Sequence, residues 1–276
     1  MTTVDAPVMA RAAAPPAVAG RAWRAFRAIL WRDLYVTGKE FWVLLVQVAL
    51  TPLFMLFIFA KVLVNQGSVS PTYGHDLLLP GIVALSAFLT ALQGIAFPLI
   101  MEFGWTREIE DRLLAPLPTG LVAVEKLVIA TLRGLAAALI VYPVGALVLG
   151  SAPWRPAGLP LLLVAVLLGA WVGAGIGLTL GAIVPAGRIT ILFAVVVTPL
   201  LFTGATQYAW PLLNGIRWFQ VVTAANPLTY CAETVRAAMV PAVPHIRPGV
   251  SVAVLLAAAA VFTGAGLITF GRRAAS

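Results

Sequence analysis

The charged residues that stand closest together lie in one polar segment between two apolar runs, residues 102–120. Its central charged members are Arg107, Glu108, Glu110, Asp111 and Arg112. On a helix such side chains can pair at i,i+4 spacing, while Ile109, Leu113 and Leu114 can line one apolar face. A charged helix held rigidly between two spans can pass the movement of a partner protein into the membrane. The same spacing also fits a solvated loop helix.

Few residues elsewhere could support catalysis or hold a metal. The two histidines, His75 and His245, have no ligand set near them in the sequence, and Cys231 is the single cysteine. One cysteine cannot form an intrachain disulfide, a four-cysteine zinc cage or an iron-sulfur cluster. A phosphate-binding loop needs two spaced glycines followed by Lys and Ser or Thr, and no lysine of this sequence has that context. Any ATP must therefore be hydrolysed by another chain.

The composition places most of the chain in lipid. Of the 276 residues, 61% are hydrophobic and 10% are charged, and the mean hydropathy is +1.00. A soluble domain carries about 25% charged residues and could not hide several apolar runs of about 20 residues, the length that crosses the hydrocarbon core. The net charge of +8 does not indicate nucleic-acid binding, because the basic residues flank the apolar runs and no nucleic-acid-binding module is visible. We expect an all-α integral membrane protein.

Six apolar segments are long enough to cross the bilayer as helices. They cover residues 41–60, 77–101, 121–149, 159–184, 189–206 and 250–270. An even number of crossings puts both termini on one side. If that side is the cytoplasm, twelve of the 18 Lys and Arg residues face it, five face outward and Arg133 falls within a span. This bias predicts cytoplasmic termini.

Two N-terminal regions precede the first span. Residues 1–20 are rich in Ala and Pro and lack an apolar face, which predicts a disordered cytoplasmic tail. In residues 21–40, apolar side chains such as Phe26 fall on one helical face and basic side chains such as Arg32 on the opposite one. This pattern is typical of an amphipathic interfacial helix on anionic headgroups. A cleaved signal peptide would have a shorter charged region and a small-residue cleavage site.

The segment 207–248, between the last two spans, contains too many prolines to cross the bilayer as one helix. Its aromatic residues include Tyr208, Trp210, Trp218 and Tyr230. Tyr and Trp prefer the headgroup level, and this preference fits two interpretations. In one, the segment is a partly inserted re-entrant helical hairpin whose aromatic residues gate the outer mouth. In the other, the same residues only anchor the segment at the interface.

The predicted fourth span carries four glycines at i,i+4 spacing: Gly169, Gly173, Gly177 and Gly181. Such a stripe lets membrane helices approach closely, because packing drives their association in lipid. A chance stripe in a segment rich in Gly and Ala would look the same. The partner helix, within the chain or in a second copy, does not follow from the sequence.

Arg133 lies within the predicted third span, six residues past Leu127 and so about 9 Å further along the helix. A charge at that depth is costly unless it reaches the headgroups or a polar cavity. Arg133 is therefore expected either to extend back to the cytoplasmic headgroups or to line a transport path.

Three segments together resemble the type-2 ATP-binding-cassette (ABC) exporter permeases, a family that includes drug, lipid and cell-surface glycan exporters. They are the basic amphipathic helix before the first span, the sequence Thr-Arg-Glu-Ile-Glu-Asp-Arg-Leu-Leu-Ala-Pro-Leu-Pro at 106–118, and Asn-Pro-Leu-Thr-Tyr-Cys-Ala-Glu-Thr-Val-Arg at 226–236. In that family the segment after the second span is the coupling helix that docks on the nucleotide-binding subunit, and two permeases pair around a central path. The resemblance implies that residues 107–114 form the coupling region and that 226–236 lie within an external re-entrant hairpin.

The resemblance also implies a six-span permease domain over residues 41–276. The chain would be the transmembrane subunit of an exporter in a bacterial cytoplasmic membrane, moving a drug-like, lipid or lipid-linked glycan substrate out of the cytoplasm. It would bind no cofactor itself, since ATP and Mg²⁺ belong to the partner ATPase subunit, and it would pair with a second permease. A membrane-embedded enzyme would need a catalytic set that is not visible, and an ion-coupled carrier or channel would need carboxylates in the middle of its spans. These two functions are the alternatives.

Overall fold

The computed structural model describes residues 18–39, 50, 54–62, 65–67, 70, 74–106, 118–150 and 153–275. Within these ranges all regular structure is helical. Five helical segments are long and apolar enough to cross a membrane: Asp76–Gly104, Thr119–Leu149, Pro156–Ile183, Ala186–Thr203 and Pro248–Ala274. The chain is an all-α, multi-pass membrane protein. The five segments correspond to five of the six predicted spans, and the predicted span 41–60 lies mostly outside the described residues.

The helical elements follow one another with few long breaks. The α-helices are α1 (Val18–Lys39), α4 (Leu79–Met101), α6 (Thr119–Leu149), α7 (Leu159–Ile183), α8 (Ile189–Leu192), α9 (Thr198–Thr203), α10 (Arg217–Ala224), α11 (Pro227–Met239) and α12 (Pro248–Ala274). Short π-helical segments are η1 (Ile58–Val62), η2 (Gly74–Leu78), η3 (Glu102–Thr106) and η6 (Phe193–Val197), and the 3₁₀ turns are η4 (Pro156–Gly158), η5 (Ala186–Arg188) and η7 (Trp210–Gly215).

Local sequence signals explain most helix ends. Gly150 ends α6 in the left-handed conformation, with φ of 77°, which glycine adopts without strain. The helices α7, α11 and α12 each have proline in their first two positions, where no intrahelical N–H bond is lost. Asn226 caps α11, since its side-chain oxygen accepts a hydrogen bond from the Leu228 N–H at 2.9 Å. The predicted span 189–206 is divided into α8, η6 and α9, and it ends at Thr203.

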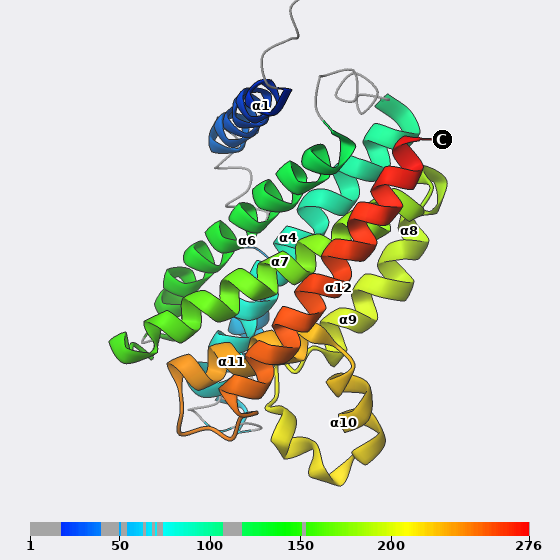
Figure 1. Cartoon of the computed structure of the whole chain (residues 1–276). Coiled ribbons are helices and arrows are strands. Elements are labelled where there is room, and N and C mark those ends of the chain that lie inside the picture. The colour runs from blue at the N-terminus through cyan, green and yellow to red at the C-terminus, as the bar shows by residue number, and fades with distance from the viewer. Residues whose placement is uncertain are drawn as a thin grey trace, which may run out of the picture.

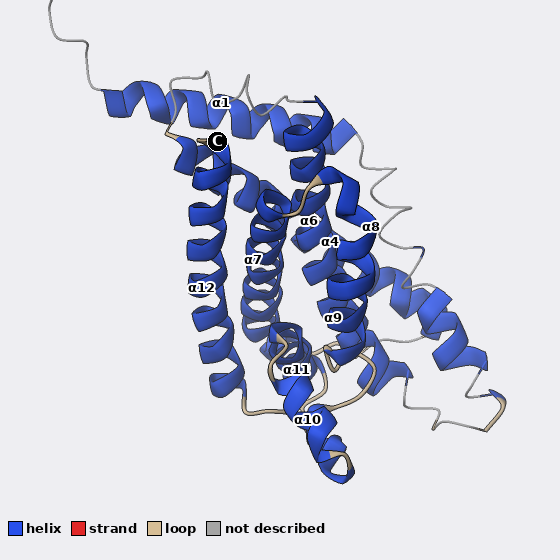
Figure 2. Ribbon diagram, turned by 90° about the vertical axis from the view of Figure 1, so that its right-hand side faces the viewer, coloured by secondary structure: helices blue, strands red, loops and turns tan. Residues whose placement is uncertain are grey.

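The helices form a bundle whose two ends differ. The helix α1 and the C terminus lie at one end, and α10 and α11 lie at the other (Figure 1). Figure 2 shows that α1 lies across its end of the bundle, where it contacts α6. The Phe26 side chain of α1 is buried, whereas Arg27 and Arg32 are exposed. Because α1 begins at Val18, the last residues of the predicted 1–20 tail are helical, and residues 1–17 lie outside the described residues.

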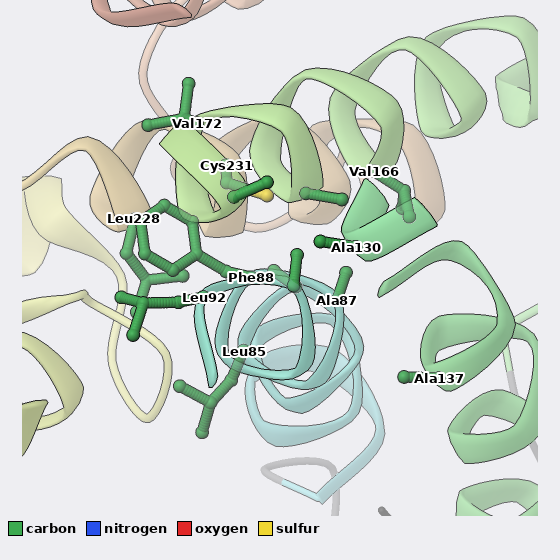
Figure 3. Packing of buried hydrophobic residues seen from close by; sticks show 14 of the residues in the cluster. Leu85, Ala87, Phe88, Leu92, Ala130, Ala137, Val166, Val172, Leu228 and Cys231 are labelled. Carbon is green, nitrogen blue, oxygen red and sulfur yellow. The ribbon is translucent and has the colours of Figure 1, made fainter. Parts of the chain in front are cut away.

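The core lies where α7 packs against α4, α6, α11 and α12. Phe88 and Leu92 of α4 meet Leu228 and Cys231 of α11 there, beside Val172 of α7 (Figure 3). The most apolar stretch of the span 76–104 is 67% buried, whereas that of the span 186–203 is 6% buried. The span 186–203, and most of α12, therefore present apolar surface to whatever surrounds the chain.

Candidate functional site

The predicted external hairpin is built from η7, α10 and α11. The short helix α10 carries exposed apolar side chains, including Trp218, which is 71% exposed. By contrast, nearly every side chain of α11 is buried, because this helix packs against α4, α7 and α12. The polar backbone ends of α11 are thus enclosed in protein, which is the condition for non-spanning backbone in a membrane.

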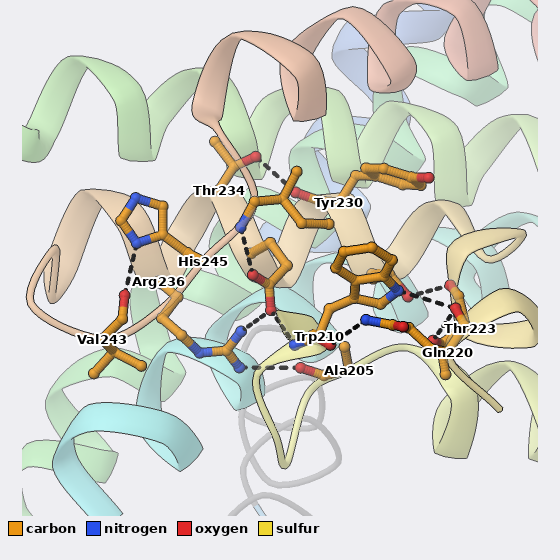
Figure 4. A network of polar contacts seen from close by, with 12 residues as sticks. Ala205, Trp210, Gln220, Thr223, Tyr230, Thr234, Arg236, Val243 and His245 are labelled. Carbon is orange, nitrogen blue, oxygen red and sulfur yellow. Dashed lines mark hydrogen bonds and ion pairs between the residues drawn. The ribbon is translucent and has the colours of Figure 1, made fainter. Parts of the chain in front are cut away.

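A buried ion pair connects three parts of this hairpin. Glu233 and Arg236 lie three residues apart on α11, and both side chains are fully buried. One Glu233 oxygen accepts hydrogen bonds from Arg236 Nη1 and from the Trp210 backbone N–H (2.9 Å). The other oxygen accepts from the Ile246 N–H at 2.9 Å, and Arg236 Nη2 donates to the Ala205 carbonyl at 3.0 Å. Figure 4 shows Arg236 beside Ala205 and Trp210.

The backbone at Ala205, which belongs to this network, has an unusual conformation. Ala205 is fully buried and has φ of 50°, a left-handed conformation that is uncommon for residues other than glycine. Its carbonyl is one acceptor of the Arg236 guanidinium. The hydrogen bond to a charged donor holds the Ala205 peptide in this conformation.

The four aromatic residues predicted to gate the outer mouth lie in the same hairpin, where Tyr208 and Trp218 both pack on the Phe219 ring, with centroids 5.8 and 5.5 Å apart. The Trp210 indole N–H donates to the Gln220 carbonyl (3.0 Å), and the Tyr230 hydroxyl donates to the Ala224 carbonyl (2.8 Å). Tyr208 donates to the Phe202 carbonyl at 2.9 Å, and burial raises the pKa of this phenol, which stays neutral. Trp218 is the exposed member.

The glycine stripe of α7 lies against helices of the same chain. A Cβ placed at Gly173 would lie 2.3 Å from the Phe88 carbonyl oxygen, and one at Gly177 would lie 2.3 Å from the Leu92 carbonyl oxygen. At Gly169 it would meet the Cys231 sulfur of α11 at 2.2 Å. These separations are shorter than any real Cβ contact, so α4 and α11 approach α7 as closely as they do only because these residues are glycine.

The fourth glycine, Gly181, has more room than the other three. A Cβ there would lie 3.0 Å from side-chain atoms of Leu99 on α4. Leucine can yield by a small movement, whereas the carbonyl groups beside Gly173 and Gly177 cannot. The closest approach of α4 and α7 is therefore in the middle of the stripe.

Arg133 extends toward α1. Its Nε and Nη2 atoms donate to the Thr37 hydroxyl oxygen at 3.1 and 2.8 Å. Thr37 lies near the end of α1, on the same side of the bundle as the C terminus. Arg133 thus has a polar partner on α1, the helix that is expected at the cytoplasmic interface.

A polar cavity of about 180 Å³ lies beside this contact, between α1, α4 and α6. Its lining includes the charged residues Asp33, Glu102, Glu125, Lys126 and Arg133. Lys126 Nζ bridges both carboxylate oxygens of Glu102, at 2.8 and 2.7 Å. Glu125, near the start of α6, is buried.

Residues 107–114, predicted to couple the chain to an ATPase, lie outside the described residues. The described residues immediately before them, in η3, are held by contacts to three other parts of the chain. Glu102 pairs with Lys126 of α6, and the Phe103 ring packs on Phe270 of α12 with 5.8 Å between centroids. A Cβ placed at Gly104 would lie 2.5 Å from the Ala186 Cβ of η5. The start of the predicted coupling segment is therefore attached to several spans at once.

Neither the Glu102–Lys126 nor the Glu233–Arg236 ion pair is among the predictions from the sequence. Pairing of Glu102 with Lys126 could have been predicted, since opposite charges lie at the facing ends of two consecutive predicted spans. Glu233 and Arg236 give a weaker signal, an i,i+3 charge pair in a segment otherwise poor in charge. Their burial depends on how α11 packs into the bundle, which no local pattern indicates.

The comparison with protein families decides the class of this arrangement. A family model described as ABC-2 type transporter matches residues 24–240. The chain belongs to the ABC-2 type transporter family. No curated protein and no solved structure matches the chain. The ABC-2 match runs from α1 to the residue after α11, so it includes the predicted coupling segment and the α11 ion pair.

ABC-2 membership makes the chain a transmembrane permease subunit of an ABC transporter. Subunits of this family carry out transport, and they typically pair with an ATPase subunit. Among the described residues no group of His, Cys, Asp or Glu could hold a metal ion. In the part of the chain that the structure describes, contacts thus hold the residues before the predicted coupling segment at one end and the predicted hairpin at the other.

Proposed function

We propose that this chain is the transmembrane subunit of an ATP-driven exporter and that a separate nucleotide-binding subunit docks on residues 107–114. The observation that carries this proposal is the attachment of η3 to α6, α12 and η5. A partner that moves the segment after η3 would move three spans together, because closely packed elements transmit displacement with little slack.

The permease acts as a dimer with a second copy or a homologous permease. Its span 186–203 supports this assignment, since Ile191, Val195 and Phe202 are each more than half exposed along it. Exposed apolar side chains on one span fit either lipid or a second permease. The low burial of this span contrasts with the enclosed α4 and α7.

The chain lies in a bacterial cytoplasmic membrane with α1 and both termini on the cytoplasmic side. The excess of basic residues on that side supports this orientation. Exposed Arg27 and Arg32 on α1, next to exposed Trp31 and Tyr35, support a position among anionic headgroups. The hairpin of α10 and α11 then lies at the outer face.

The cargo is an amphiphile, namely a drug-like molecule, a lipid or a lipid-linked glycan. A largely apolar membrane domain supports this class, because such substrates can enter from the bilayer without losing contact with apolar surface. Outward transport is part of the proposal and follows from the resemblance to exporters.

Co-purification tests the proposal. The full chain with an affinity tag is isolated from membranes in mild detergent, and bound ATP-binding subunits are detected by photolabelling with an azido-ATP analogue. We expect a labelled ATPase subunit in stoichiometric amounts, with vanadate-sensitive ATP hydrolysis. If the chain alone, reconstituted without such a subunit, moved solute in response to an ion gradient, the ion-coupled carrier would replace this proposal.

A further inference from the structure

An apolar groove of about 380 Å³ lies at the end of the bundle away from α1 and the C terminus, where α6 and α7 are joined. Leucine is the commonest residue in its walls, which include Leu135 and Leu139 of α6 and Leu162 and Leu163 of α7. Leu139 is 77% exposed and Leu163 is 64% exposed, so the groove opens sideways from the bundle. In a membrane protein such an opening faces hydrocarbon chains.

The rim of the groove carries residue types that prefer the headgroup level of a membrane. The Tyr142 hydroxyl donates to the Pro153 carbonyl at 3.0 Å, and the Tyr142 and Trp154 rings are 6.3 Å apart. Tyrosine and tryptophan concentrate where hydrocarbon meets headgroups. Among the described residues that line the groove, Arg155 is the one charged side chain, and it is exposed. It forms no ion pair with another described residue.

We propose that this groove binds an anionic phospholipid, with one acyl chain between α6 and α7 and the phosphate beside Arg155. A guanidinium binds phosphate oxygens through paired, charge-assisted hydrogen bonds. The described residues of the lining include no carboxylate to receive the ammonium of a zwitterionic headgroup. The net positive rim therefore favours a lipid such as phosphatidylglycerol over phosphatidylcholine.

The floor of the groove connects the lipid to the external hairpin. Ala238 and Met239, the last two residues of α11, line it together with Gly158. A Cβ at Gly158 would lie 2.0 Å from the Ala238 carbonyl oxygen, so the start of α7 and the end of α11 touch there. An acyl chain in the groove would contact the same helix that carries Glu233 and Arg236. Bound lipid therefore stabilises the position of α11, because a ligand of the folded state favours that state.

Native mass spectrometry of the purified full chain tests the site, with phosphatidylglycerol and phosphatidylcholine added at equal concentrations. The wild type should retain phosphatidylglycerol in preference, and Arg155→Gln should bind it about fivefold more weakly, the loss expected for one basic residue at the membrane surface. Arg217→Gln is the matched control, since Arg217 is also exposed, at the start of α10, and lies outside the groove. It should bind as the wild type does.

A second variant tests the chain-binding part of the groove. Leu139→Trp should fill the groove and reduce retention of both lipids. Phosphatidylglycerol should raise the thermal midpoint of the wild type more than that of Arg155→Gln. Equal retention by the wild type and Arg155→Gln, or equal loss in Arg217→Gln, would overturn the proposal. So would efficient disulfide cross-linking between two copies of Leu139→Cys in vesicles, because a second permease would then cover the groove.

Discussion

Glu233 and Arg236 of α11 form a fully buried ion pair. Glu233 also accepts hydrogen bonds from two backbone N–H groups, and Arg236 donates one to a backbone carbonyl. The five hydrogen-bonding groups come from three separate stretches of chain. Removing one member leaves a buried charge without its partner, which costs more than the intact pair contributes. The pair therefore fixes the hairpin in one arrangement.

We expect Glu233→Gln to destabilise the protein by about 3 kcal/mol, since it leaves the Arg236 charge uncompensated in the interior. The measurement is the thermal midpoint of the purified chain in detergent. The double variant Glu233→Leu with Arg236→Met should regain part of the loss, because neither charge is then buried. If the double variant were as unstable as the sum of the two single ones, the two residues would not act as a pair.

The middle of the glycine stripe should tolerate no side chain. Gly173→Ala places a methyl group against the Phe88 carbonyl, and we expect a loss of about 1 to 3 kcal/mol from overpacking. Gly264→Ala in α12 is the control, because nothing lies within 4 Å of a Cβ at that position. It should be neutral or stabilising by up to about 1 kcal/mol, since alanine favours helix.

Thiol labelling reports the same packing without a stability assay. Cys231 is the single cysteine, is buried, and faces Gly169. A maleimide should label the native wild type slowly and Gly173→Ala faster, while Gly264→Ala should match the wild type. Rapid labelling of the native wild type would mean that α11 does not pack inside the bundle as described.

Arg133 should serve to hold α1 rather than to contact the cargo. Thr37→Val removes the hydroxyl that accepts from Arg133, and Arg133→Gln removes the donor. We expect similar losses of about 1 kcal/mol in stability from either change and little further loss from both together. Export measured with a fluorescent amphiphile should fall alike in both variants. A transport path through Arg133 would instead be indicated by loss of export in Arg133→Gln alone.

The ion pair at the start of the predicted coupling segment can be tested by exchanging its charges. Glu102→Gln should weaken the hold of η3 on α6 by about 2 kcal/mol, the value of a hydrogen bond to a charged group. ATP hydrolysis stimulated by the assembled permease should fall with it. The exchanged pair, Glu102→Lys with Lys126→Glu, should recover much of the stimulation, and failure to recover any would show that the attachment itself does not matter.

Hydropathy predicted the spans because it reports the solvent around a helix, and here that solvent is lipid. The predicted fourth span, 159–184, differs from α7 by one residue at its end. The prolines of 207–248 likewise predicted that this segment does not cross the bilayer as one helix. What hydropathy does not report is which helix lies next to which, so the partners of Gly173 and Gly177 on α4 emerged only from the fold.

The ion pairs were harder to predict for a second reason. Charged residues outside apolar runs are ordinarily solvated, so Glu233 and Arg236 carried no sign that both would be fully buried. Their burial depends on α11 entering the bundle, which is a long-range packing event. The coupling residues 107–114 were found from charge density and family resemblance, and their role stays a prediction because they lie outside the described residues.

The most direct test of energy coupling is ATP hydrolysis by the permease reconstituted in vesicles with its ATP-binding subunit. The variant carrying Glu108→Lys and Asp111→Lys should keep its thermal midpoint and its elution volume on gel filtration. Its stimulated ATP hydrolysis should drop to the rate of the ATPase subunit alone, because reversed charges disrupt a complementary docking surface. Wild-type stimulation by a correctly folded double variant would contradict the claim that residues 107–114 receive the movement of an ATPase partner.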